Sequence, residues 1–279
     1  MSRVAVATAR GVEDPDTALL VSALADARIS AQLAIWDDET VPWDDYDLVV
    51  VRSTWDYSAR RSDFLAWART IAHLHNPLSA IEYSSDKIYL QDVAARGLAI
   101  IPSHYAAVGE TPVFFDGDFV VKPRVGAGSN DALRYREGDE QAATRHVHAL
   151  HARGRDVLIQ PYVHSVDTLG ERGLIFIDGQ YSHAITKGAM LNVPPGERDF
   201  LYRRRQIRAV TAEDDAVQTA TSVLATLGCD SLLYARVDLV ATIRGWLVME
   251  VELVEPSLFL TFDADAAHRL AEGIARRLS

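Results

Sequence analysis

The 279-residue chain carries 28 basic and 39 acidic side chains, a formal net charge of −11, and 48% hydrophobic residues. This is the composition of a globular protein with a sizeable core, and so acidic a chain disfavours nucleic-acid binding. The single cysteine excludes an intrachain disulfide and a cysteine-rich metal site, and no apolar run has the length of a membrane span. We therefore expect a cytoplasmic protein without nucleic-acid or membrane partners, whose oligomeric state, a homodimer included, stays open.

The first part of the chain alternates apolar strands with helices. Apolar runs at 4–8, 31–36 and 47–51 predict strands, and Asp16 is the expected cap of the helix between the first two. Continuous apolar strands separated by helices indicate a parallel sheet that is covered on both faces. We predict an α/β domain over residues 1–85.

The remainder of the chain follows a different pattern. Asp178-Gly179 and Arg244-Gly245 each stand between two apolar runs, which predicts two antiparallel hairpins. Helices predicted at 86–96 and 139–153 alternate with strands at 119–124 and 157–160. The sequence therefore predicts two α+β subdomains with antiparallel sheets, over 86–160 and 161–279.

A glycine-rich loop follows the predicted strand that carries Lys122. Gly126, Gly128 and Ser129 allow the backbone to approach an anion closely, so the loop is suited to cover phosphates. The order of residues matches neither a P-loop nor a dinucleotide-binding fingerprint. A plain glycine-rich turn is the alternative that this loop leaves open.

Three carboxylates fall on the second predicted hairpin. Glu250 and Glu252 are two residues apart on one strand, so they share a face, and Asp238 can reach that face from the partner strand. Three carboxylates so close together repel one another unless a cation neutralises them. Because all the ligand atoms are oxygens, Mg²⁺ is favoured over Zn²⁺. The alternative is a solvent-facing side of an antiparallel sheet.

The order of these elements resembles the ATP-grasp superfamily, in its glutathione-synthetase-like branch. The similarity covers essentially the whole chain and is carried by Ser85-Asp86-Lys87, Val121-Lys122-Pro123, the loop 126–129, Gln160-Pro161-Tyr162-Val163, Glu171-Arg172, Lys187, Arg236-Val237-Asp238 and Glu250-Val251-Glu252. Within that branch the chain is similar to cyclo-ligases of D-cycloserine biosynthesis. The resemblance implies an ATP-grasp fold, in which the two subdomains clasp ATP.

The resemblance also implies roles for individual residues. Phosphates of ATP would be held by Lys87, Lys122, Gly126, Gly128 and Ser129, adenine would contact Gln160, Pro161, Tyr162 and Val163, and Glu171 would lie near the ribose. Asp238, Glu250 and Glu252 would hold two Mg²⁺, although the usual pattern has Asn at position 252. Arg172, Lys187 and Arg236 would be the catalytic cations.

Two further segments leave alternatives open. Arg52, Ser53 and Thr54 follow the strand 47–51 at its carboxyl end, where open α/β sheets bind ligands, so they are predicted to bind the substrate. A fixed salt bridge from Arg52 to Asp14 or Asp56 is the alternative. The arginines at 203–205 belong to a solvated loop or to a lid attracted to ATP.

The implied activity is an ADP-forming carboxylate–amine ligase with a small amino-acid-like substrate. A carboxylate would be activated as an acyl-phosphate and attacked by a nitrogen, most simply to close O-ureido-D-serine to D-cycloserine with loss of CO₂ and ammonia. An intermolecular ligase and a non-catalytic nucleotide-binding module are the alternatives. The retained lysines and carboxylates argue against the module.

Overall fold

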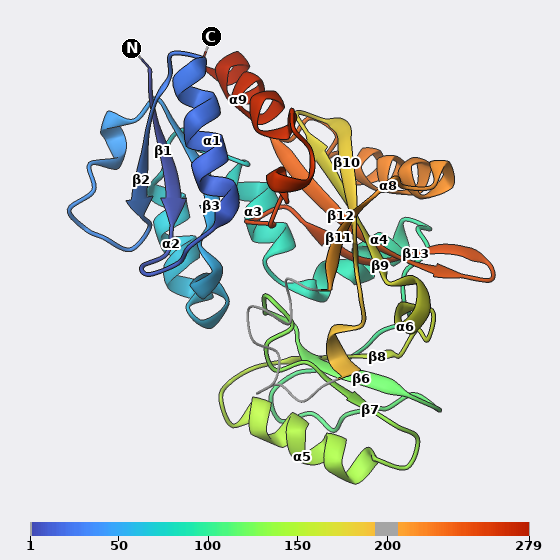
Figure 1. The fold of residues 1–279 in the computed structure, drawn as a ribbon. Helices are drawn as coiled ribbons and strands as arrows, with labels where there is room; N and C mark the ends of the chain where they lie inside the picture. Colours follow the sequence, from blue (N-terminus) through green and yellow to red (C-terminus); the bar gives the residue numbers. More distant parts are fainter. Residues whose placement is uncertain (1, 193–205, 279) are drawn as a thin grey trace.

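The structure is a computed structural model that describes residues 2–192 and 206–278, and its described residues form three sheets (Figure 1). The arginines at 203–205 lie outside the described residues. None of the described helices combines the length and the apolarity that crossing a bilayer requires.

The N-terminal sheet is parallel, with the strand order β2-β1-β3-β4. Alternate residues of β1 feed two separate cores. Val4 and Val6 pack on the side of α1, whereas Ala5 and Ala7 pack on the side of α2, as a sheet covered on both faces requires. Its elements are β1 (Arg3–Thr8), α1 (Pro15–Asp26), β2 (Ser30–Ile35), β3 (Leu48–Ser53), α2 (Arg61–Thr70) and β4 (Leu74–His75).

The first helix begins two residues earlier than expected. Asp14, not Asp16, is its N-cap, and the Asp14 carboxylate accepts a hydrogen bond of 3.0 Å from the backbone N–H of Asp16. Pro15 at the first helical position fixes this start, because proline lacks the N–H that the cap would have to satisfy. The Asp16 carboxylate is thereby left for a contact outside the helix.

A small antiparallel sheet with the order β5-β8-β6-β7 forms the lower part of the molecule in Figure 1. Helix α5 covers one face of it through Ala143, Val147 and Leu150. Its elements are β5 (His104–Ala106), β6 (Phe119–Pro123), β7 (Leu133–Tyr135), α5 (Glu140–His151) and β8 (Val157–Pro161).

The largest sheet is antiparallel, with the order β11-β10-β9-β12-β13, and both predicted hairpins are confirmed within it. The fold class is therefore confirmed as parallel α/β followed by α+β. The elements of this part are α6 (Val166–Leu169), β9 (Glu171–Ile177), β10 (Gln180–Lys187), β11 (Ile207–Val210), α8 (Asp214–Leu227), β12 (Tyr234–Thr242), β13 (Gly245–Glu252) and α9 (Ala266–Arg277).

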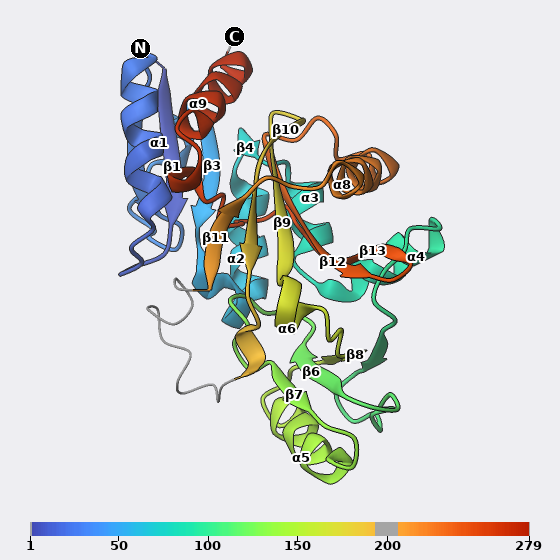
Figure 2. The ribbon, with the colours of Figure 1, turned by 45° about the vertical axis from the view of Figure 1, so that its right-hand side comes forward.

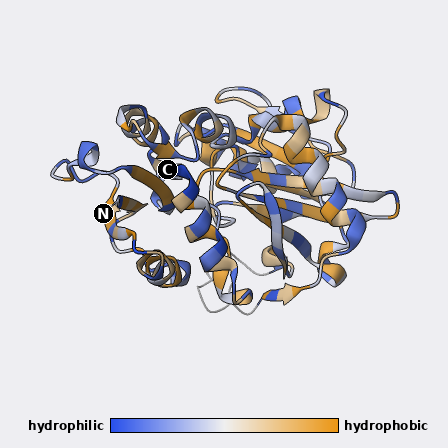
Figure 3. Ribbon diagram, turned by 90° about the horizontal axis from the view of Figure 1, so that it is seen from above, coloured by the Kyte–Doolittle hydropathy of each residue, from blue (hydrophilic) through white to orange (hydrophobic). Residues whose placement is uncertain are grey.

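Helices pack both on this sheet and between the sheets. Helix α9 lies beside α1 in both views, so the last helix of the chain joins the N-terminal sheet to the largest one (Figure 2). Hydrophobic residues concentrate along the strands, and the helices carry hydrophilic stretches as well (Figure 3). Strands and helices therefore both contribute to the buried core.

The segment between the first two sheets packs differently from its predicted assignment. Helices α3 (Leu78–Ser84) and α4 (Leu90–Ala95) contribute Ala80, Leu90 and Val93 to the core under the five-stranded sheet. The small sheet begins only at β5. Packing therefore places the start of the predicted 86–160 subdomain with the largest sheet, and the boundaries at residues 85 and 160 stay predictions.

Buried polar contacts fasten the N-terminal sheet to the largest sheet. The fully buried Asn76 amide donates to the carbonyls of Tyr234 and Leu253 at 2.8 Å each and accepts from the Leu233 N–H at 3.0 Å. The Asp16 carboxylate accepts from the backbone N–H groups of Leu258 and Leu260 at 3.1 and 2.8 Å. These hydrogen bonds fix the position of the N-terminal sheet relative to the largest sheet.

We predict that Asn76→Ala lowers the free energy of unfolding by about 3 kcal/mol, because buried backbone groups lose their partners. Urea unfolding followed by circular dichroism measures the loss. Gln218→Ala, which removes an exposed amide from α8, is the matched control and should stay within about 0.5 kcal/mol of the wild type. Equal stability of the two variants would show that Asn76 does not join the sheets.

Candidate active site

A cavity of about 920 Å³ opens between the three sheets. Strands β6 and β8 border it on one side, and β9, β10, β12 and β13 on the other. Of the residues predicted from the sequence, those that line it are Lys87, Lys122, Gly126, Gly128, Ser129, Gln160, Pro161, Tyr162, Val163, Glu171, Lys187, Arg236, Glu250 and Glu252. The fold therefore builds one cavity from segments that are far apart in the chain.

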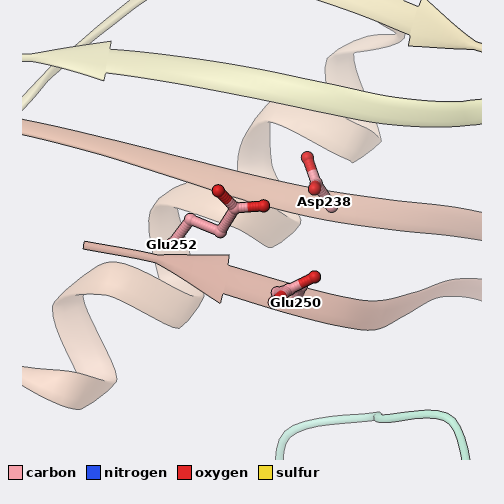
Figure 4. A group of neighbouring side chains, drawn as sticks. All are labelled: Asp238, Glu250 and Glu252. Atoms are coloured by element: carbon pink, nitrogen blue, oxygen red, sulfur yellow. The ribbon is translucent and has the colours of Figure 1, made fainter. Parts of the chain in front are cut away.

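Strand register sets the charged face of this cavity. Opposite each other on neighbouring strands stand Lys187 and Glu171, Arg236 and Glu252, and Asp238 and Glu250. Figure 4 shows Asp238 on one strand and the two glutamates on the next. Oxygen atoms of these three carboxylates lie within 4.8 Å of one another. The predicted shared face is thus present in the structure.

Each of these carboxylates has a cationic partner. Lys87 Nζ lies 2.7 Å from Glu250 Oε1, and Lys187 Nζ lies 2.8 Å from Asp238 Oδ2 and also pairs with Glu171. Arg236 donates to both oxygens of Asp238 at 2.9 and 3.1 Å and to Glu252. Lys187 spans β9 to reach Asp238, where Gly173 stands opposite Asp238 and leaves room for its carboxylate.

The ion pairs set the protonation of the site. Burial opposes ionisation of Asp238, but Arg236 and Lys187 outweigh it and lower the pKa of this carboxyl to about 2. Burial raises the pKa of Glu252 to about 7, although Arg236 acts in the other direction. Asp238 is therefore a fixed negative charge, whereas Glu252 ionises less readily than Asp238.

Lys122 differs from the other cations of the site. Within the part of the chain that the structure describes, its ammonium makes no hydrogen bond and no ion pair. Burial lowers the pKa of Lys122, although Glu250 nearby raises it. A half-buried cation without a partner, facing a cavity, is suited to receive an anionic ligand.

Lysine is confined to this cavity. The chain contains three lysines among 28 basic residues, and all three line the cavity. Lysine is a compact, strongly hydrated point charge that flexes on a long stem, whereas arginine is a rigid fork. The lysines are therefore placed where a cation must move between partners.

The loop 126–129 closes one wall of the cavity. Lys87 Nζ donates to the Gly126 carbonyl at 2.8 Å, which ties the loop to the charged face. Gly128 and Ser129 adopt positive φ angles of 62° and 57°, so the loop turns sharply at these two residues. The lining of the cavity also includes an apolar set near β6 and β8, where Gln160 is the polar member. Its apolar residues are Ile101, Val120, Val163, Leu191 and Met249.

Five predicted site residues do not line the cavity; one is Asp238, which is 1% exposed and pairs with Arg236 and Lys187. Arg172 turns to the opposite face of β9, where its guanidinium donates to Glu213 at 2.9 and 3.1 Å. Strand alternation explains this placement, because Glu171 faces the cavity and its neighbour must face away. The structure thus corrects the expected contact between Arg172 and reacting groups.

Arg52, Ser53 and Thr54 are the other three. They are 1%, 1% and 0% exposed, which corrects the prediction that they contact the substrate directly. Arg52 Nη2 lies 4.0 Å from Asp14 and 3.9 Å from Asp16, so the alternative of a fixed pairing with Asp14 fits better. A buried arginine requires such partners, and Asp14 and Asp16 do line the cavity.

Sequence reasoning also missed residues at the end of the cavity nearest the N-terminal sheet. Trp55, Tyr57 and Glu255 line this end. The one available signal was Glu255, a charged residue within the otherwise uncharged run 253–258 directly after the carboxylate hairpin. Its place in the cavity depends on tertiary structure.

The site fits a hard divalent cation. Three carboxylates with closely grouped oxygens form a purely oxygen donor set, which is what Mg²⁺ prefers. Both Asp238 oxygens already accept from Arg236 or Lys187, so Glu250 and Glu252 offer the more accessible atoms.

Comparison with known proteins assigns the family. The chain is 40% identical to the cycloserine biosynthesis protein DcsG of Streptomyces lavendulae, over 95% of this chain and 94% of that protein. A family profile described as the N-terminal domain of D-cycloserine synthetase DcsG matches residues 4–78. The chain belongs to the D-cycloserine synthetase family.

Solved structures show that this family shares the fold of the ATP-grasp ligases. The crystal structure of D-cycloserine synthetase DcsG superposes with a TM-score of 0.89 at 36% identity, and each chain is covered completely. D-alanine–D-alanine ligase from Bacillus anthracis, crystallised with ATP, gives a TM-score of 0.69 at 15% identity over 100% of this chain and 97% of that one. This member of the family thus has the fold of the ATP-grasp ligases.

We predict that Lys187→Met lowers the free energy of unfolding by about 3 kcal/mol, because the buried Glu171 loses its cation. Thermal and urea unfolding in the absence of nucleotide measure the loss. Adding Glu171→Gln should restore at least half of it. Arg69→Met breaks an exposed pair with Glu82 and should cost less than about 1 kcal/mol. A loss no larger than that of Arg69→Met would contradict a structural role of the buried pair.

Proposed function

We propose that the protein closes O-ureido-D-serine to D-cycloserine, using ATP and forming ADP. The observation that carries the proposal is a cavity with a three-carboxylate group and a lysine that has no partner among the described residues. The chain that forms it is 40% identical to a cycloserine biosynthesis protein over nearly its whole length. The cations suit a polyphosphate and the carboxylates suit its metal ion.

ATP would lie along the seam between the small sheet and the largest sheet. Lys122 would receive the phosphates, and Lys87 would leave Glu250 to join it, with the loop 126–129 folded over both. The apolar end around Gln160 and Val163 would hold adenine. This placement gives the Lys122 ammonium an anionic partner.

Glu250, Glu252 and Asp238 would hold Mg²⁺ once Lys87 has turned to the phosphates. The bound metal would neutralise phosphate charge and orient the terminal phosphoryl group. Glu252 stands where the superfamily pattern has Asn, so the carboxylates carry one more negative charge than that pattern supplies. Arg236, which pairs with Glu252, offsets this charge.

The reaction requires an activated carboxyl group, because hydroxide is a poor leaving group. Transfer of the terminal phosphoryl of ATP to the substrate carboxylate gives an acyl-phosphate and ADP. The ureido nitrogen bonded to oxygen then attacks the carbonyl carbon, loses its proton and expels phosphate, which closes a five-membered ring. Hydrolysis of the carbamoyl group by one water gives D-cycloserine, CO₂ and ammonia.

Three features of this chain would assist. Lys122 would spread charge on the phosphoryl group in transfer, and Arg236 would stabilise the oxyanion that develops at the attacked carbonyl. Lys187 would hold Asp238 and Glu171 in place. Because nucleophile and electrophile belong to one molecule, orienting them supplies much of the rate enhancement.

We predict that O-ureido-D-serine and ATP give ADP, phosphate and D-cycloserine in equal amounts. Coupled assays for ADP and phosphate, with mass spectrometry of the product, measure this. Dipeptide formation when a second amino acid is added would identify an intermolecular ligase. AMP in place of ADP would contradict acyl-phosphate chemistry, and ATP binding without turnover would leave a nucleotide-binding module.

Lys122→Met tests the same proposal within the protein. Loss of this cation should lower kcat/KM by a factor on the order of 10², the effect of removing an electrostatic contact to transferring charge. Lys122→Arg keeps the charge and should recover only part of the activity, because the rigid fork replaces a point charge. Wild-type turnover in Lys122→Met would overturn the assignment.

A further inference from the structure

Glu255 is a buried carboxyl group that the proposed chemistry does not use. It follows β13, is 6% exposed and lines the cavity. Among the described residues its carboxyl group makes no hydrogen bond and no ion pair, and only its backbone carbonyl has a partner, Trp55 Nε1 at 3.3 Å. An acidic group so deeply buried without a partner calls for a ligand that supplies one.

The other acidic groups at this end of the cavity already have partners. Asp14 caps α1, and Asp16 accepts from the backbone of Leu258 and Leu260. The Tyr57 hydroxyl resembles Glu255, since it is buried, borders the same cavity and forms no hydrogen bond in the described part of the chain. Among the described residues, Glu255 and Tyr57 therefore offer buried polar groups that are available to a ligand.

The charges around Glu255 do not compensate it. Burial and the neighbouring Glu252 raise the pKa of Glu255 well above its usual range, while Arg236, Arg52 and Lys87 act against this from a distance. Asp14 and Asp16 add negative charge at the same end, offset by Arg52. A ligand cation would supply the contact that these three basic side chains do not make.

The chain also places Glu255 beside the proposed reaction centre. Arg236 Nη1 donates to the Ser257 carbonyl at 2.9 Å, so the segment that carries Glu255 lies against the guanidinium. In an α-amino acid, one carbon separates the ammonium group from the carboxyl carbon. A substrate whose carboxyl group faces Arg236 would thus carry its ammonium group only a short distance away.

We propose that Glu255 binds the α-ammonium group of the amino-acid substrate, with the Tyr57 hydroxyl as a second polar contact. This inference rests on the proposed function and names the subsite that distinguishes an α-amino acid from a simple carboxylic acid. Glu255 acts on substrate binding rather than on ATP.

The test compares O-ureido-D-serine with its des-amino analogue, 3-(ureidooxy)propanoic acid, in the wild type and in Glu255→Gln. The wild type should show a KM about 30-fold higher for the analogue, the effect of losing one charge-assisted hydrogen bond in a buried site. Glu255→Gln should raise KM for O-ureido-D-serine by a similar factor. KM for ATP should stay within about twofold, and the two enzymes should treat the analogue alike.

Glu272→Gln is the matched control, because it removes an exposed carboxylate from α9 and should change none of these values. Equal KM of the wild type for substrate and analogue would overturn the inference, whether or not Glu255→Gln folds. A fall in kcat for both compounds in Glu255→Gln, with KM unchanged, would also overturn it and assign proton transfer to this residue instead.

Failure of the proposed function would look different. In that case the wild type forms no D-cycloserine but consumes ATP with another amino acid. The comparison is then made with that amino acid and its des-amino counterpart, and Glu255→Gln should abolish the difference between them. A difference that persists in the variant would overturn the role of Glu255.

Discussion

Like charges on one buried sheet face cannot stay unpaired, and this constraint organises the molecule. Glu171, Asp238, Glu250 and Glu252 share a face because strand register places them there, and Lys87, Lys187 and Arg236 neutralise them from three different segments. Lys122 is the fourth cation, and in the described part of the chain it has no carboxylate of its own. A polyanion and a divalent cation can enter such a cluster together by exchanging partners, with little change in net buried charge.

The use of lysine agrees with this exchange. Among the described residues outside the cavity the basic side chains are arginines, and several of them hold ion pairs, such as those of Arg276 and Arg277 with Asp178. Inside it, Arg236 holds Asp238 bidentately while the lysines can pivot on flexible stems. The cavity thus combines a rigid cation that fixes a carboxylate with mobile cations that can follow a ligand.

Local pattern predicted the parts of the fold and site that depend on period-2 alternation. It placed Glu250 and Glu252 on one face with Asp238, and it predicted both hairpins. The same alternation, applied to Glu171 and Arg172, would have turned Arg172 away. For Arg52 the sequence offered the pairing with Asp14 only as an alternative, and Glu255 was beyond prediction. Their surroundings come from the start of α1 and from the segment after β13, which only the tertiary fold brings together.

The account depends most on the exchange of Lys87 for a metal ion at Glu250. The direct measurement is the affinity for ATP as Mg²⁺ is titrated, compared between the wild type and Glu250→Gln by calorimetry. We expect wild-type affinity to rise steeply with Mg²⁺ and the variant to lose at least about tenfold of that rise, which is 1.4 kcal/mol of coupling. The same dependence on Mg²⁺ in both proteins would contradict the account.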